Sequence, residues 1–194
     1  MAIVCNFDCE LGGLTTAPNC GTLGGIQYAA WAQYDDIDWA GMVDASPSNL
    51  DGNVVDDFIM ESSATFHRLE IEKDASFYQA EYTDDNRYYE TVATLIFNGK
   101  DAANSAVFTN ALRCCNVVLV LWGNDCSGRI LGVDLFGESF STPIRPMRIT
   151  RHLDAGGQID SDEPRDELDL TARNLSTPIF HDVDWADFQS YLPA

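Results

Sequence analysis

The chain has 194 residues, and 45% of them are hydrophobic, which is enough for one substantial core and argues against global disorder. The 31 acidic and 11 basic residues give a net charge of −20, which disfavours general binding to nucleic acid or anionic membranes. No apolar run approaches the roughly 20 residues of a membrane-spanning helix, and Met1–Cys5 does not begin a secretory signal. We therefore expect no membrane anchor.

Cysteine usage predicts reduced thiols. Without a signal peptide, an even number of cysteines does not by itself indicate disulfides. The first three have no CxxC spacing and no nearby histidine, which argues against a zinc knuckle. The six cysteines are Cys5, Cys9, Cys20, Cys114, Cys115 and Cys126.

The N-terminal quarter predicts an arm, two strands and a long loop. Glycines and a proline punctuate residues 1–24, after a short predicted strand at Ile3–Phe7. Ile26–Trp31 and Ile37–Val43 are apolar and predict buried strands. The acidic stretch Asp44–Asp57 predicts a long loop, which could serve an interface or form a mobile hairpin tip.

Alternating patterns predict three further strands. Thr65–Lys73 and Ser76–Thr83 are expected to pair with each other as antiparallel strands joined near Lys73. Arg87–Phe97 predicts the next strand, with Leu95 and other alternate residues on one face.

One amphipathic helix is predicted over about residues 101–115. Asp101 is a suitable N-cap, and Ala103, Val107 and Ala111 recur at a spacing of four. We expect this stripe to pack against the core.

The second half of the chain predicts the centre of a sheet and its partners. Val117–Trp122 is continuously apolar, as in a central strand, and Arg129–Phe136 is expected to return beside it. Ile144–Leu153 predicts an edge strand, because prolines lie in and before it and three arginines argue against burial of either face. Glu167–Leu175 predicts the last clear strand, and the aromatic tail after Pro178 either folds back or docks on a neighbour.

No motif indicates catalysis. The chain lacks GxSxG, HExxH, P-loop and GxGxxG sequences, and its histidines are scattered. The acids between Asp154 and Glu163 lack the EF-hand pattern and predict a solvated turn. We therefore expect no enzyme activity and no catalytic, cofactor-binding or metal-binding residues.

Four segments from Tyr88 onward follow one another in a characteristic order: ETVATLIFNG, KDAANSAVFTNALRCC, NVVLVLWGNDCSGRILGVDLFG and HLDAGGQIDSDEPRDELDLTARN. This order of elements resembles that of tail tube proteins of tailed bacteriophages. The glycine-rich N-terminal arm is also similar. The resemblance covers about half of the chain.

This resemblance implies a mainly β chain, an antiparallel β-sandwich or barrel with one packed helix, a long loop and terminal arms. It also implies hexameric rings that stack into a hollow tube in the virion tail, assembled in the bacterial host cytoplasm with other virion proteins. DNA would pass through the lumen without tight binding. The net charge suggests an acidic lumen that repels the phosphate backbone.

Two alternatives remain open. The chain could be another virion component, such as a tail terminator, a head-tail connector or a capsid decoration protein. It could also be a small acidic β-barrel that acts as a hydrolase or binds a ligand.

The tube hypothesis divides the chain into an N-terminal arm (1–24), one β domain (25–177) and a C-terminal arm (178–194). The loop and the C-terminal arm, with nearby apolar residues, are the expected subunit contacts. The candidate contact residues are Trp39, Val54, Val55, Phe58, Phe180, Trp185, Phe188 and Tyr191.

Overall fold

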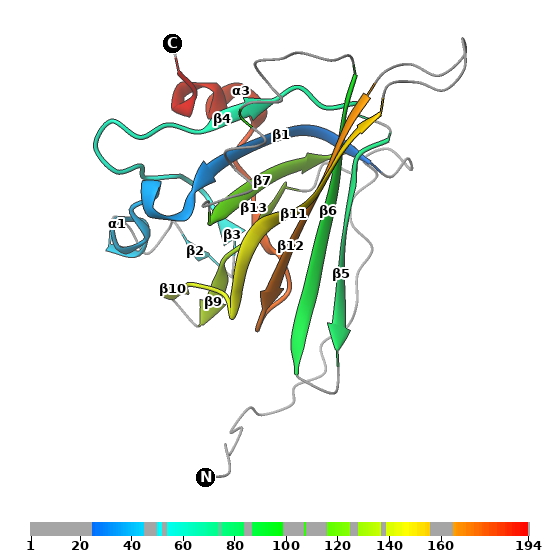
Figure 1. Ribbon diagram of the computed structural model, residues 1–194. Coiled ribbons are helices and arrows are strands. Elements are labelled where there is room, and N and C mark those ends of the chain that lie inside the picture. The colour runs from blue at the N-terminus through cyan, green and yellow to red at the C-terminus, as the bar shows by residue number, and fades with distance from the viewer. Residues whose placement is uncertain are drawn as a thin grey trace.

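The computed structural model confirms a mainly β chain with a sandwich-like arrangement of strands (Figure 1). The predicted N-terminal arm, the turn near 156–164 and nearly all of the helix at 101–115 lie outside the described residues. Val107 is the described residue of that helix; it is helical but 51% exposed, so it does not belong to a buried stripe. The structure describes residues 25–44, 50–51, 54–73, 75–83, 87–98, 107, 116–124, 128–136, 139–155 and 165–193.

The strands form two layers, which we call the central sheet and the long sheet. They join at one pair, Met147 with Val117. All strand pairs are antiparallel except β3 with β13. The central sheet has the order β4 (His67–Leu69), β1 (Ile26–Gln33), β7 (Val117–Gly123), β8 (Gly128–Leu131), β13 (Ile179–His181), β3 (Val54–Val55) and β2 (Leu50–Asp51). The long sheet has the order β5 (Phe77–Thr83), β6 (Tyr88–Asn98), β12 (Arg165–Asn174) and β11 (Arg145–Ala155).

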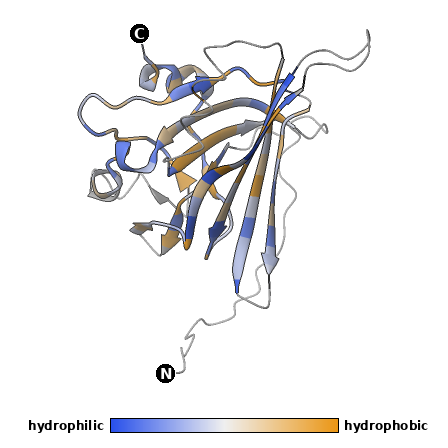
Figure 2. Ribbon diagram, in the orientation of Figure 1, coloured by the Kyte–Doolittle hydropathy of each residue, from blue (hydrophilic) through white to orange (hydrophobic). Residues whose placement is uncertain are grey.

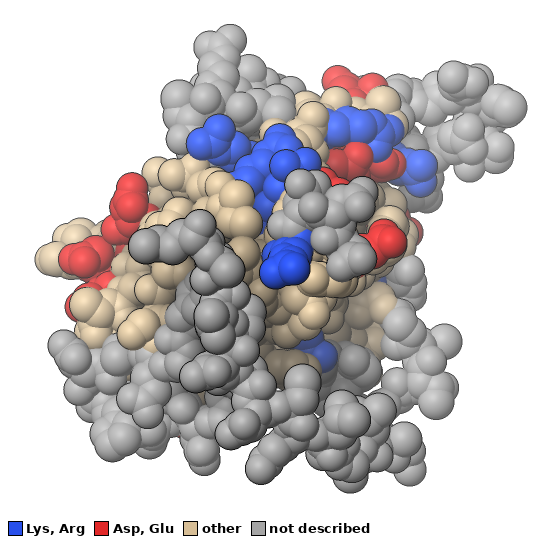
Figure 3. Space-filling view, turned by 90° about the horizontal axis from the view of Figure 1, so that it is seen from below, with Lys and Arg blue, Asp and Glu red and all other residues tan. Residues whose placement is uncertain are grey.

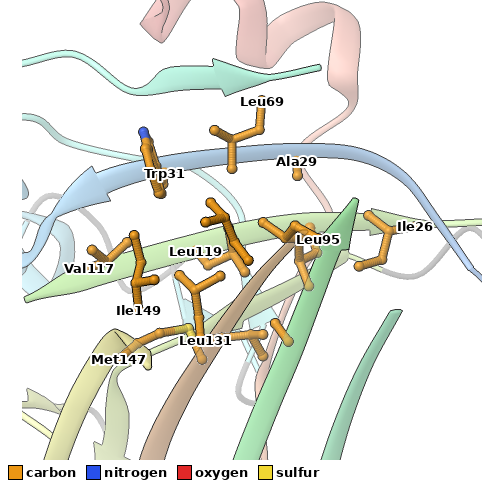
Figure 4. Close-up of a cluster of buried hydrophobic side chains, with 14 of the residues drawn as sticks. Ile26, Ala29, Trp31, Leu69, Leu95, Val117, Leu119, Leu131, Met147 and Ile149 are labelled. Atoms are coloured by element: carbon orange, nitrogen blue, oxygen red, sulfur yellow. The ribbon is translucent and has the colours of Figure 1, made fainter. Parts of the chain in front are cut away.

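The first hydrophobic core lies between the two sheets (Figure 4). From the central sheet, Leu119 and Leu121 of β7 point into it, together with Trp31 of β1. From the long sheet, Leu95 and Leu168 are fully buried there. The alternating burial of β12 thus confirms its predicted inward face. On β6, Ala93, Leu95 and Phe97 enter the same core, as predicted for alternate residues.

A second core covers the opposite face of the central sheet. Val118, Val120 and Trp122 of β7 enter it, so successive β7 residues serve different cores. Its cover consists of α1 (Trp39–Asp44), part of the 55–66 segment, α3 (Trp185–Phe188) and the 3₁₀ turn η2 (Gln189–Tyr191). Burial on both faces explains why β7 is continuously apolar, as Figure 2 shows.

The predicted strand Ile37–Val43 is wrong, because the chain forms α1 there. Ile37 makes only a single bridge to Met60. Asp38 then acts as the N-cap: its Oδ1 accepts a hydrogen bond from the Gly41 N–H at 2.8 Å. A local side-chain cap therefore outweighs the strand-like composition.

The predicted pairing of the 65–73 and 76–83 strands is also wrong. β4 pairs with β1, and β5 pairs with β6. The chain between them crosses from one sheet to the other, where the Glu72 N–H donates to the Ile96 carbonyl at 2.7 Å. Leu69 is thereby buried against the central sheet.

The predicted return strand Arg129–Phe136 is interrupted at Gly132, whose φ is +93°. A Cβ there would lie 2.5 Å from the Val117 carbonyl oxygen, so only glycine fits where β11 replaces β8 beside β7. The second half forms β9 (Asp134–Phe136), which pairs with β10 (Ser139–Ser141).

The C-terminal tail folds back on its own chain. β13 adds to the central sheet, and Phe188 is fully buried against Phe66 and Trp122. The Trp122 indole N–H donates to the Val183 carbonyl at 2.8 Å. The tail also contains α3 and η2, which are therefore part of the fold.

Two of the buried ionisable side chains have a pKa that burial shifts. His181 lies beneath Gly128, with Nε2 3.0 Å from the Leu121 carbonyl, and burial lowers its pKa to about 4. Asp134 accepts hydrogen bonds from the Leu175 and Ser176 N–H groups, while burial raises its pKa. Both residues hold neighbouring chain segments in place.

We predict that Phe188→Ala lowers the free energy of unfolding by about 3–5 kcal/mol, because it opens a cavity in the second core. Phe180→Ala in the same tail is the matched control, since Phe180 is 47% exposed. Chemical denaturation of both variants measures the difference. Equal, small losses would contradict the burial of the tail.

We predict that His181 makes the protein less stable as pH falls from 6.5 to 4. In the unfolded chain its imidazole binds a proton near the ordinary histidine pKa of 6.5, whereas in the folded chain it resists protonation down to about 4. This difference amounts to at most about 3 kcal/mol, lost progressively across that window. His181→Gln should therefore flatten the pH dependence of unfolding measured between pH 7.5 and 4.5.

His67→Gln, on the exposed part of β4, is the control for that measurement. Asp134 is present in all of these proteins, so the contribution of its raised pKa cancels in the comparison. A pH dependence of His181→Gln as steep as that of the unmodified chain would contradict the assignment.

Candidate subunit interface

The outer face of the long sheet is turned away from the first core and carries a mixture of charged, polar and apolar residues. On β12, inward Leu168, Leu170 and Ala172 alternate with outward residues. Cross-strand pairing extends this outer face over β6 and β5. Its outward charged residues are Arg145, Arg148, Arg151, Arg165, Arg173, Glu81, Glu90, Glu167 and Asp169.

Two β-bulges place three arginines of β11 on this outer face. In a regular strand, Arg145 and Arg148 would point to opposite faces. However, the register with β12 shifts once between Arg145 and Arg148 and again between Ile149 and Arg151. Arg145, Arg148 and Arg151 therefore lie opposite Arg173, Thr171 and Asp169, all on one face. We call these three β11 residues the arginine row.

The members of the arginine row differ in their partners. Arg151 contacts both Asp169, at 2.9 Å, and Glu167, and the hydrogen bonds that it donates to these carboxylates raise its pKa. Arg148 donates to the neutral Asn116 side chain at 3.2 Å. Arg145 is exposed and directly opposite Arg173, and neither Arg145 nor Arg148 has an ion pair within the described part of the chain.

Elsewhere on this face, charge is partly balanced. The Arg173 Nε lies 3.9 Å from Glu90, and its guanidinium is 4.7 Å from the centre of the Tyr88 ring. In the view from below, basic side chains gather in one band with acidic ones beside part of it (Figure 3). The arginine row is thus a basic border on a strongly acidic chain.

The opposite border of the long sheet is β5. Glu81 is its one charged residue, and its cross-strand neighbour on β6 is Glu90, another acid. Phe77 and Tyr82 on the same strand are each 50% exposed. Among the described strands, β5 pairs only with β6.

Among the described strands, the arginine border also lacks a partner over most of its length. β11 pairs with β12 along the strand, but with β7 only at Met147. In the part of the chain that the structure describes, β11 is therefore an edge strand after Met147, as predicted, but not at Met147 itself. The long sheet thus presents two strand edges, one basic and one acidic.

Three of the eight predicted contact residues do not lie on a free surface. Val55, Phe58 and Phe188 are buried in the second core and offer no side-chain surface to a neighbour. They help to cover one face of the central sheet, and their role in subunit contacts stays a prediction.

Three further predicted contact residues pack at the edge of the same core. Trp39 donates to the Tyr34 carbonyl at 2.9 Å, and Trp185 stacks on Tyr28. Tyr191 donates its hydroxyl to Asp57, and burial, followed by this bond, raises its pKa to about 12.

Phe180 and Val54 lie side by side in the paired strands β13 and β3. Val54 is half-buried. Phe180 is the most exposed of the eight, although the Arg129 guanidinium lies 3.5 Å from its ring centre.

Among the residues that the structure describes, no group of three or more His, Cys, Asp or Glu side chains could hold a metal ion. Within the same residues, no helix is both long and apolar enough to cross a bilayer. Comparisons with protein-family models, curated proteins and solved structures found no match to the chain.

Proposed function

We propose that this chain is a virion structural protein, a tail tube subunit that assembles with copies of itself into stacked rings. The observation that carries the proposal is the pair of open edges on the long sheet. β5 and β11 are 7 and 11 residues long, and each lacks a strand partner over most of its outer side among the described strands. Long open edges readily template pairing with another chain.

The directions of the strands suit ring closure. Each strand of the long sheet is antiparallel to its neighbour, so β5 and β11 at its two borders also run antiparallel. If β5 of one copy lies beside β11 of the next, the antiparallel pattern continues from subunit to subunit. Repetition of this contact closes a ring and removes the edges.

In such a ring, the outer face of the long sheet would line the lumen, because its other face is already occupied by the core. That face carries five arginines as well as four acids on the described strands. These strands would supply a mixed wall rather than an acidic one. The acidity of the assembled lumen stays a prediction, as does the passage of DNA without tight binding.

We predict that the purified chain forms stacked hollow rings, visible by negative-stain electron microscopy. Isolated rings that never stack would instead favour a tail terminator or connector. Particles that stay monomeric across protein concentrations and salt conditions would contradict assembly and favour a ligand-binding or hydrolytic β-barrel.

A matched pair of proline substitutions tests whether β5 makes the contact. Adjacent N–H groups on a strand point in opposite directions, so only one of Gln79 and Ala80 donates towards β6. Proline at the residue whose N–H donates to β6 should lower the melting temperature. Proline at the residue whose N–H points away from β6 should leave folding intact and block assembly. Normal assembly of both folded variants would exclude this edge.

A further inference from the structure

The two borders of the long sheet have opposite charge. Arg145, Arg148 and Arg151 occupy three consecutive outward positions of β11, because the two bulges keep them on one face. On β5, the outward position two residues after Gln79 is Glu81, the one charged residue of the strand. Opposite charges on facing strands stabilise a pair, and like charges destabilise it.

We propose that the β5 edge of one copy docks on the β11 edge of a second copy, with Glu81 seated against the arginine row. This inference rests on the proposed ring assembly and specifies which edges meet. It makes the contact heterologous, so that each subunit uses a different edge towards each of its two neighbours.

Symmetric alternatives oppose like charges. Pairing β11 with β11 would bring two arginine rows together. This would add like charge at a border where Arg145 already faces Arg173 within one chain. Pairing β5 with β5 would bring two Glu81 side chains together, each already beside Glu90. Only the β5–β11 combination joins the acidic border to the basic one.

The arginine row tolerates more than one register. Directly opposite and diagonal residues on facing strands both interact, so three consecutive arginines keep Glu81 near at least one guanidinium. Arg151 is already held by Asp169 and Glu167, which leaves Arg145 and Arg148 to receive a carboxylate from outside. Arginine suits this contact because its guanidinium can bind a carboxylate through two hydrogen bonds.

A charge-exchange experiment tests the proposal on the full-length chain. Glu81→Arg and Arg148→Glu should each raise the apparent dissociation constant of assembly about five- to tenfold, since each opposes like charges. The double variant restores opposite charges at every contact and should return to within about threefold of the unmodified chain. Sedimentation velocity measures assembly, and thermal melting confirms folding.

Glu61→Arg is the control, because this exposed residue lies beside the second core, away from the long sheet. Its substitution changes the net charge by the same amount as Glu81→Arg. If Arg148→Glu disturbs folding through loss of its Asn116 contact, Arg145→Glu replaces it.

Three results would overturn the proposal: single variants that assemble normally, a double variant as weak as the singles, or Glu61→Arg as weak as Glu81→Arg. Loss of binding to a short DNA duplex by Arg148→Glu, with assembly unchanged, would also overturn it and assign the row to phosphate. All of these results require that the unmodified chain assembles. A chain that never assembles would instead refute the proposed function itself.

Discussion

The fold depends on the burial of β7 on both of its faces. Leu119 and Leu121 pack towards the long sheet, whereas Val118 and Val120 pack beneath the C-terminal segment. The same backbone pairs with β1 and β8 and meets β11 at Val117. Because one strand contributes to both hydrophobic cores, neither core can open without exposing part of the other. We therefore expect the two cores to unfold together.

The sequence pattern predicted a strand correctly where the spacing of its apolar residues matches the faces that are buried. The continuous apolar run of β7 and the alternation of β12 required no knowledge of distant partners. Pairing was harder, because β4 joins β1, which lies much earlier in the chain, instead of the nearby β5. The prediction of a strand at Ile37–Val43 failed for another reason. The apolar composition of this segment suits a strand, but the hydrogen bond from the Gly41 N–H to the Asp38 side chain caps the start of a helix.

The candidate interface was less predictable than the fold. Val55 and Phe58 were predicted as contact sites because they are apolar and lie near acidic residues. In the structure they belong to the second core, which covers the face of the central sheet that is turned away from the long sheet. Conversely, the three arginines of β11 are visible in the sequence at spacings of three, which strict alternation assigns to both faces. Only the observed register with β12 shows that two extra residues bring them together.

The arginine row also has a consequence for how ionic strength acts on this chain. Copies that carry a net charge of −20 repel one another at long range, while an acidic edge and a basic edge attract at contact. Salt screens both effects over a Debye length of about 8 Å at physiological ionic strength. In the proposed assembly, added salt would therefore speed the encounter of subunits but loosen the seam between them. Growth and persistence of the assembly would then have different salt optima.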